Sequence, residues 1–347
     1  MNVLSLFDGI SCGQLALQRA GIEYENYFAS EIDKYAIQIT QKNFPKTIQL
    51  GDVNKYNDWN LPKIDLLIGG SPCQDLSLSK KDRQGLKGEK SKLFYIYVSV
   101  LKLVKPKYFL LENVASMPKE AKEEITKILG VEPILINSAL VSAQQRKRLY
   151  WTNIPGIKQP EDKNISLKDI IISGIPYTNK SQALTATYQK CVFHDSINKH
   201  RRTMIAEDMK WCNDKNLEHL MRPFGSKAHI VCIEQEKSPT LIAAMGMGGG
   251  NGIYFADKNN LTSNLYRVEN GTTYINNKKY NIKLPDGIYS IRKLTPTECE
   301  RLQTLPDNYT EGVSNSQRYK TIGNGWTVDV IAHIFKNIPE EIKWKIG

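Results

Sequence analysis

The chain has 347 residues, of which 41% are hydrophobic and 24% charged, proportions typical of a globular protein. No apolar run reaches the roughly 18 residues needed to span a bilayer, and the opening stretch MNVLSLFDG has no basic leader. Composition therefore excludes a transmembrane protein, and we expect neither a membrane partner nor a signal peptide. The net charge of +11 is compatible with a polyanionic partner, although it is spread along the chain and a basic surface explains it about as well.

The first 155 residues alternate strand-like and helix-like segments. Strands are predicted at 3–7, 27–29, 48–51, 64–68, 108–111, 134–137 and 149–153. Helices are predicted at 13–20, 33–43, 91–104 and 118–130, the last with proline at its start and glycine at its end. Such alternation predicts an α/β fold with a mostly parallel sheet covered by helices.

From about residue 177 the composition changes. Residues 177–291 are richer in Asn, Gly, Thr and Tyr, with short strand-like pieces such as GIYF at 252–255. Helical patterning returns at Thr295, where Pro296 and Glu298 complete a capping box, and a last helix is predicted over about 326–336. We therefore expect domains at 1–176 and 177–318, the second strand-rich and ending in a hinge, with 319–347 returning to the first domain.

The six cysteines lie at positions 12, 73, 191, 212, 232 and 299. None pair as CxxC, and no His/Cys cluster has the spacing of a zinc site. We expect no disulfide framework and no metal, and a reducing cytoplasm as the compartment.

Acidic residues follow several of the early predicted strands. The first strand runs into FDGISCG (7–13), a turn that lets a ligand approach the backbone but lacks the GxGxxG of dinucleotide sites. Glu31, after the second strand, suits ribose hydroxyls, and Asp52, after the third, could accept from an adenine amino group. Each carboxylate alone is more often a solvated surface charge. Together at one sheet edge they favour an adenosine-type ligand.

A single cysteine follows the fourth strand in GGSPCQDLS (69–77). A lone cysteine is usually a small buried hydrophobe, but Cys73 lies at the sheet edge where ligands bind in open α/β folds. Glu112 ends the next strand and could face the same pocket as a proton donor, or simply cap a helix. Arg146 and Arg148, on an extended segment, could hold a carbonyl oxygen or a phosphate, or form a solvated basic patch.

The order of these motifs resembles the DNA (cytosine-5)-methyltransferase family, bacterial or phage type. The resemblance spans nearly the whole chain, apart from a variable region at about 177–290 where the family keeps its target recognition domain. The stretches LSLFDGIS, IGGSPCQDLS, VSAQQRKRLYW and GNGWTV are similar to the mammalian de novo DNA methyltransferases. Two departures concern the cofactor pocket: the first motif has few glycines, and Trp326 stands where a small or aliphatic residue is common.

The resemblance implies a Rossmann-like S-adenosylmethionine-dependent methyltransferase that methylates C5 of a cytosine flipped out of double-stranded DNA. Cys73 would attack C6, Glu112 would bind N3 and the exocyclic amine, and one of Arg146 and Arg148 would hold O2, with Arg148 the first choice. Arg146 and Arg148 would also favour the thiolate.

The resemblance further implies a cofactor site. It would be formed by Phe7, Asp8, Gly9, Ile10, Ser11, Glu31, Ile32, Asp52, Val53, Pro72, Leu93, Asn324 and Trp326. From the residues alone, 74–88 could close over the flipped base or be a plain charged loop, and 240–241 with 248–251 could face DNA or form a turn. We expect a monomer associated with the nucleoid of a prokaryotic or phage-infected cell; a cognate restriction endonuclease is left open.

Three alternatives remain. A tRNA cytosine methyltransferase shares these motifs, but its subgroup carries a Cys-Phe-Thr-x-x-Tyr stretch that this sequence lacks. Adenine-N6 and cytosine-N4 enzymes use an Asp/Ser-Pro-Pro-aromatic tetrad, whereas here Cys73 follows the proline. A catalytically silent DNA-binding module is the third, and the presence of Cys73, Glu112 and both arginines argues against it.

Overall fold

The computed structural model describes residues 1–71, 92–199, 202–208, 265–275 and 278–339. The chain divides into two compact units, neither of which is continuous in sequence. The first comprises Met1–Ile170, Lys180–Lys190 and Thr295–Gly347, and the second Ile171–Asn179 and Cys191–Leu294.

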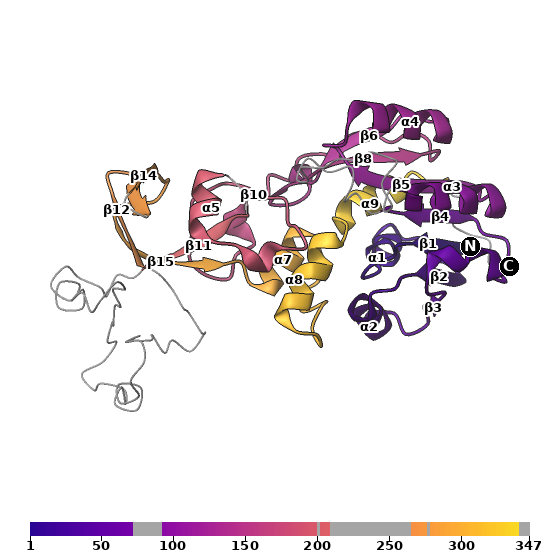
Figure 1. The fold of residues 1–347 in the computed structure, drawn as a ribbon, viewed down its shortest axis with the longest axis horizontal. Coiled ribbons are helices and arrows are strands. Elements are labelled where there is room, and N and C mark those ends of the chain that lie inside the picture. The colour runs from indigo at the N-terminus through magenta and orange to yellow at the C-terminus, as the bar shows by residue number, and fades with distance from the viewer. Residues whose placement is uncertain (72–91, 200–201, 209–264, 276–277, 340–347) are drawn as a thin grey trace. The chain divides into compact units, whose positions relative to one another are not determined.

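A seven-stranded sheet forms the centre of the first unit (Figure 1). Its order is β3-β2-β1-β4-β5-β8-β6. The strands are β1 (Asn2–Leu6), β2 (Asn26–Ser30), β3 (Ile48–Gln49), β4 (Leu66–Gly69), β5 (Tyr108–Val114), β6 (Ile134–Asn137) and β8 (Lys147–Thr152). Neighbours from β3 to β5 are parallel, whereas β8 runs antiparallel to both β5 and β6. The predicted mostly parallel sheet is therefore confirmed. A short separate pairing joins β7 (Gln144–Gln145) to β10 (Ser181–Gln182).

The helices predicted from the sequence are confirmed in this unit. They are α1 (Cys12–Arg19), α2 (Lys34–Asn43), α3 (Lys92–Val104), α4 (Lys119–Leu129), α7 (Pro296–Leu302) and α9 (Val328–Phe335). Helix α4 ends at Gly130, whose φ of 69° is the left-handed conformation that glycine adopts readily. The capping box at Thr295 is also present, because Glu298 N donates to the Thr295 hydroxyl and Thr295 N to the Glu298 carboxylate. Helix α8 (Asn315–Asn324) was not predicted.

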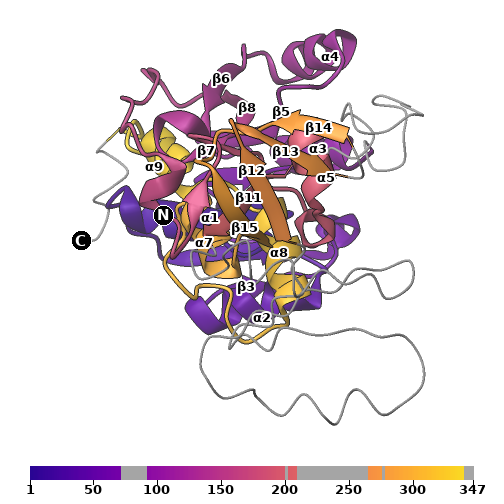
Figure 2. The same ribbon diagram turned by 90° about the vertical axis from the view of Figure 1, so that its left-hand side faces the viewer.

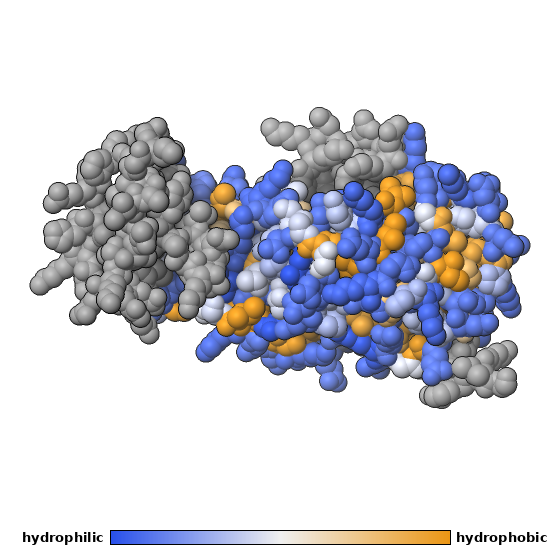
Figure 3. Space-filling view, turned by 90° about the horizontal axis from the view of Figure 1, so that it is seen from below, coloured by the Kyte–Doolittle hydropathy of each residue, from blue (hydrophilic) through white to orange (hydrophobic). Residues whose placement is uncertain are grey.

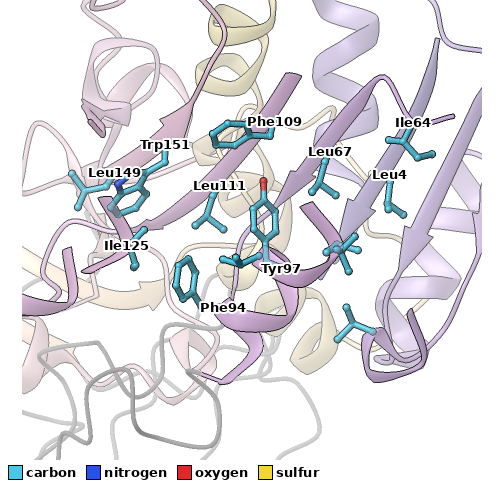
Figure 4. Packing of buried hydrophobic residues seen from close by; sticks show 14 of the residues in the cluster. Leu4, Ile64, Leu67, Phe94, Tyr97, Phe109, Leu111, Ile125, Leu149 and Trp151 are labelled. Carbon is cyan, nitrogen blue, oxygen red and sulfur yellow. The ribbon is translucent and has the colours of Figure 1, made fainter. Parts of the chain in front are cut away.

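One face of the sheet is covered by α3 and α4. Figure 4 shows Phe94 and Tyr97 of α3 beside Leu67 and Leu111, which point from β4 and β5 into the same apolar layer. Ile125 of α4 belongs to that layer as well. This burial of aliphatic and aromatic side chains stabilises the sheet edge on which the site lies.

The opposite face is covered by α1, which lies against α9 (Figure 1). Here Ile68 of β4 reaches the first turn of α1, and its Cδ1 lies only 2.4 Å from where a Cβ on Gly13 would be. Gly13 thus lets the helix that follows the β1 turn approach the sheet closely.

The second unit contains a six-stranded antiparallel sheet in the order β14-β13-β12-β15-β11-β9 (Figure 2). The strands are β9 (Ile175–Pro176), β11 (Met204–Asp208), β12 (Leu265–Glu269), β13 (Thr272–Ile275), β14 (Lys278–Asn281) and β15 (Gly287–Lys293), and one short helix is α5 (Phe193–Asn198). Phe193 packs against Tyr177 and Tyr266, with ring centroids 6.2 and 4.4 Å away. The predicted strand-rich character is confirmed, while the predicted strand at 252–255 lies outside the described residues.

Hydrophilic side chains cover most of the described surface visible in Figure 3, with small hydrophobic patches between them. Within the described ranges, every helix is too short or too polar to cross a membrane.

Candidate active site

The carboxyl ends of β1, β4 and β5 lie next to one another. Leu6 pairs with Gly69, and Gly69 pairs with Leu111, all in parallel register. The residues that follow these three positions therefore emerge at one edge of the sheet, the edge at which open α/β folds bind ligands.

The turn after β1 has an unusual backbone. Phe7, Gly9 and Ser11 all have positive φ, at 57°, 62° and 56°. Glu31 at the end of β2 holds this turn, since its Oε2 accepts a hydrogen bond of 2.8 Å from Gly9 N. Its Oε1 accepts from Ile32 N at 2.7 Å. Glu31 thus ties two strand ends together through backbone N–H groups.

Asp8 lies within the same turn, partly buried. Tyr27 Oη donates to its Oδ1 at 2.8 Å, and the Ser11 hydroxyl donates to its Oδ2. Burial raises the pKa of Asp8 to about 6, although the hydrogen bonds from Ser11, Ser5 and Tyr27 work in the opposite direction. Tyr27 was not identified from the sequence, because nothing in a buried strand tyrosine signals a carboxylate partner.

The third carboxylate, Asp52, is brought beside the second strand by a side-chain bond. Ser30 Oγ donates to Gly51 O at 2.7 Å. Asp52 Oδ1 accepts from Asn54 N and Nδ2 at 2.9 and 2.7 Å, and these bonds lower the pKa of Asp52. Ile32, which follows Glu31 in the sequence, is 75% exposed, an unusual exposure for a large apolar side chain.

Glu112 has a partner on each carboxylate oxygen although it is only 8% exposed. Arg148 Nε lies 2.8 Å from Oε1, and Trp326 Nε1 donates to Oε2 at 3.1 Å. Arg148 reaches Glu112 from β8, where it pairs with Val114, two residues further along β5. A buried carboxylate with two charged or N–H partners is held in one orientation.

Arg146 is 4% exposed and is bonded to backbone carbonyls. Its Nη1 donates to Leu184 O at 2.9 Å, and its Nη2 to Gly325 O at 2.9 Å and Gly323 O at 3.3 Å. The two arginines therefore have different partners: Arg148 contacts a carboxylate, whereas Arg146 fixes the segment before Trp326.

Gln303 reinforces this segment. Its Nε2 donates to Gly325 O at 3.1 Å, and its Oε1 accepts from Gln144 Nε2 at 3.2 Å and from Thr327 Oγ1 at 2.8 Å. Gln144 lies in the stretch VSAQQRKRLYW, but the sequence did not indicate that it joins Gln303 in one buried network.

The segment that leads to Cys73 is fixed up to Ser71. Asn113 Nδ2 donates to Ser71 O and Oγ at 3.3 and 3.2 Å. Cys73 and Pro72 lie outside the described residues, as do the predicted closing loop at 74–88 and the predicted DNA-facing positions 240–241 and 248–251.

The remaining predicted cofactor residues are dispersed over the first unit. Ile10 and Val53 are buried, Leu93 is partly buried against the α3 core, and Asn324 is exposed at the end of α8.

Comparison with protein families decides the identity of the chain. The family described as C-5 cytosine-specific DNA methylase matches residues 1–340. The chain belongs to this family. Membership makes the protein a DNA (cytosine-5)-methyltransferase, as the order of its sequence motifs predicted.

The DNA methylase is similar along its full length to phage enzymes. Orphan methyltransferase M.SPRI of Bacillus phage SPR is 27% identical over 97% of this chain and 97% of its own length. Orphan methyltransferase M.SPBetaI of Bacillus phage SPbeta is 26% identical with the same coverage of both chains.

Solved structures agree with the fold. The Entamoeba histolytica methyltransferase EhMeth matches with a TM-score of 0.60 and 16% identity, covering 99% of this chain and 98% of that one. The S. pombe Dnmt2 methyltransferase matches with a TM-score of 0.56 and 15% identity, covering 99% and 100%. At such identities the likeness concerns the fold alone, and it confirms the predicted Rossmann-like methyltransferase sheet.

Proposed function

We propose that this DNA methylase transfers a methyl group from S-adenosylmethionine to C5 of a cytosine flipped out of double-stranded DNA, through a transient bond between Cys73 Sγ and C6. The observation that carries the proposal is the placement of Glu112. It lies at the ligand-binding edge, one position beyond the Gly69–Leu111 pair, with both carboxylate oxygens held. In the sequence, Cys73 comes three residues after Gly70, which follows the neighbouring strand β4.

Cytosine C5 is a weak nucleophile, so the reaction needs a group that adds to C6. The Cys73 thiolate forms the S–C6 bond while the protonated Glu112 carboxyl gives its proton to N3 and accepts a hydrogen bond from the exocyclic amine, which neutralises the charge that develops on the ring. The ring is then enamine-like and C5 takes up the methyl group. Loss of the C5 proton and breakage of the S–C6 bond return Cys73 to its starting form.

The residues at the turn after β1 fit a methyl donor of this kind. S-adenosylmethionine supplies an electrophilic methyl group, and its ribose and adenine need acceptors and an apolar contact. Glu31 would accept from the ribose hydroxyls, Asp52 from the adenine amine, and the exposed Ile32 would pack on the adenine. The backbone of Phe7 to Ser11, bent by three positive φ values, would line the remainder together with Val53, Pro72, Leu93, Asn324 and Trp326.

Arg148 is the better candidate of the two arginines for the base oxygen O2. It adjoins Glu112, which would hold N3 and the exocyclic amine, on the same edge of the ring as O2. Arg146 is bonded to the carbonyls of Leu184, Gly323 and Gly325, and a guanidinium so engaged has few donors left. We assign Arg146 to the support of the site.

The second unit is the proposed reader of the DNA target. It overlaps the target recognition domain predicted for residues 177–318, of which 180–190 and 295–318 belong to the first unit. The flipped base costs a few kcal/mol of lost stacking, which contacts to the duplex must offset. The phage relatives are named orphan methyltransferases, which supports activity without a cognate restriction endonuclease.

Mechanism-based trapping tests the proposal. Bisulfite sequencing of DNA from cells that express the protein first gives the target sequence. A duplex with 5-fluoro-2′-deoxycytidine at the target position should then form a stable adduct with the wild-type protein in the presence of the cofactor, because fluorine at C5 cannot leave as the proton does. Cys73→Ser should form none.

Substrate class is tested in parallel. Tritiated methyl groups from the cofactor should label duplex DNA and leave tRNA unlabelled. Labelling of tRNA instead would favour the tRNA methyltransferase alternative, and binding of DNA without any labelling would favour the silent module.

A further inference from the structure

The indole of Trp326 reaches three elements of the site at once. Its Cζ3 lies 3.5 Å from the position of a Cβ on Gly13, at the start of α1. Its Nε1 lies 2.9 Å from the position of a Cβ on Gly70, after β4. The same Nε1 donates to Glu112 Oε2 on β5. One side chain therefore spans from the turn after β1 to the carboxylate.

The backbone on both sides of Trp326 is fixed independently of Glu112. Gly325 O accepts from Arg146 Nη2 and Gln303 Nε2, and the Thr327 hydroxyl donates to Gln303 Oε1. These groups are buried, and buried hydrogen bonds of this kind hold a segment firmly. The indole is thus presented to Glu112 from a rigid base.

Arg148, the other partner of Glu112, would change its hydrogen bonds when a base binds. In the proposed function it turns to the O2 of the flipped cytosine, which weakens or ends its bond to Oε1. Each carboxylate oxygen can accept two hydrogen bonds, so the bond from Trp326 to Oε2 can persist while the base engages the carboxylate.

We propose that Trp326 is a positioning residue for Glu112: its indole N–H holds Oε2 so that the carboxylate meets the flipped cytosine in a fixed orientation. The inference rests on the proposed function and adds to the cofactor contact expected of this residue. A carboxylate held by one strand alone would rotate about its side-chain bonds, and ordering it would cost free energy in every encounter with a base.

The inference also explains the second glycine of the GGSPC stretch. A Cβ at Gly70 would lie 2.9 Å from Trp326 Nε1 and 3.0 Å from Glu112 Oε2. A Cβ at these distances would make the indole or the carboxylate shift, and a shift of either one disturbs the bond between them. Glycine at position 70 leaves both groups where the bond forms.

Trp326→Phe tests the proposal, because it keeps an aromatic ring and removes the N–H donor together with the five-membered ring that carries it. The single-turnover rate of methyl transfer on a target duplex should fall about tenfold to a hundredfold, the range for a lost hydrogen bond to a charged group. The Kd for S-adenosylmethionine should stay within about twofold, because the ring face remains. Trp151→Phe is the matched control: Trp151 Nε1 donates to Thr126 Oγ1 in the core, away from the site, and its loss should leave the rate unchanged.

A double-mutant cycle separates positioning from a general structural effect. The readout is the preference for a duplex with the target cytosine over one with an abasic site, which needs no chemistry. Trp326→Phe should reduce this preference in the wild-type background and have no further effect in a Glu112→Ala background. An equal loss in both backgrounds, or a wild-type rate for Trp326→Phe, would overturn the proposal.

Gly70→Ala provides a second route to the same bond if Trp326→Phe does not fold. This variant keeps both Trp326 and Glu112, but its added Cβ pushes the indole and the carboxylate apart. It should therefore give the same loss of rate. A wild-type rate for Gly70→Ala would count against the inference. Failure of the wild-type protein itself to label DNA would instead refute the proposed function.

Discussion

Asp8, in the turn after β1, has a pKa well above the ordinary value for aspartate. Tyr27 and Ser11 donate to its two oxygens, yet burial outweighs them and raises the pKa of Asp8 to about 6. The folded protein therefore favours the protonated carboxyl at a pH where an exposed aspartate is ionised.

This preference gives stability a definite dependence on pH. The contribution from Asp8 is complete below its ordinary pKa of 3.8 and is lost as pH rises through about 6. Relative to Asp8→Asn, which stays neutral, the wild-type free energy of unfolding should fall by about 1 to 3 kcal/mol between acid and neutral pH and then level off. Urea denaturation of both proteins across this range measures the difference.

Asp33 is the control with the opposite sign. Burial would raise its pKa, but the hydrogen bond and charge of Lys320, with N–H bonds from α2, lower it. The stability gained from ionised Asp33 should therefore be lost as pH falls, when wild type is compared with Asp33→Asn. A difference for Asp8→Asn that does not change with pH would contradict the burial argument.

At the scale of single residues, the sequence indicated the carboxylates but not their supports. Glu31 and Asp52 follow strands, and Glu112 lies near the end of β5; the end of an apolar run is visible in hydrophobic patterning. Tyr27 and Asn113 act through contacts between segments far apart in the chain, and no local pattern records such contacts. Cys73 remains a prediction, since it lies outside the described residues.

Helix α8 is held mainly by polar contacts. Arg318 Nη2 lies 2.9 Å from Glu300 Oε1, and Lys320 Nζ lies 2.7 Å from Asp33 Oδ2. At its end Gly323 packs directly on backbone, where an added Cβ would lie 2.3 Å from the carbonyl carbon of Thr185. Backbone cannot move aside as a flexible side chain can.

Gly323→Ala should therefore destabilise the first unit by about 1 to 3 kcal/mol, the usual cost of overpacking. Differential scanning calorimetry should show a lower Tm for the variant. Ser316→Ala, at an exposed position of the same helix, is the control and should change the Tm little. A Tm for Gly323→Ala equal to that of wild type would mean that α8 can shift away from Thr185 without cost.

The same polar contacts explain why α8 was missed. Its sequence, NSQRYKTIGN, has too few apolar residues to show the 3.6-residue period that revealed α4 and α9. Its stability comes from partners in other segments rather than from an apolar stripe. Strand β8 was predicted, but its antiparallel direction was not, because periodicity alone does not give strand direction.

For the whole molecule, the net charge of +11 bears on how strongly the protein binds DNA. Each phosphate contacted by a lysine or arginine releases counterions, so the logarithm of the binding constant should fall by about 0.9 per contact for each tenfold rise in salt. Fluorescence anisotropy with a labelled duplex should show Kd rising steeply between low and physiological salt.

The Kd for S-adenosylmethionine, measured over the same salt range, is the control and should change far less. If the two ligands respond alike, the salt effect reflects the protein rather than its contacts with phosphates.

The order in which the chain is made has a consequence for the first unit. The chain passes between the two units after residues 170, 179, 190 and 294. Trp326 and α9, the neighbours of Glu112 and α1, leave the ribosome last of the described elements. We expect a nascent chain stalled before residue 326 to expose the apolar side of α1 to chaperones and to leave DNA unmethylated, although Cys73 is already synthesised. Methyl transfer by such an arrested ribosome complex would show that Trp326 and α9 are not needed for the reaction.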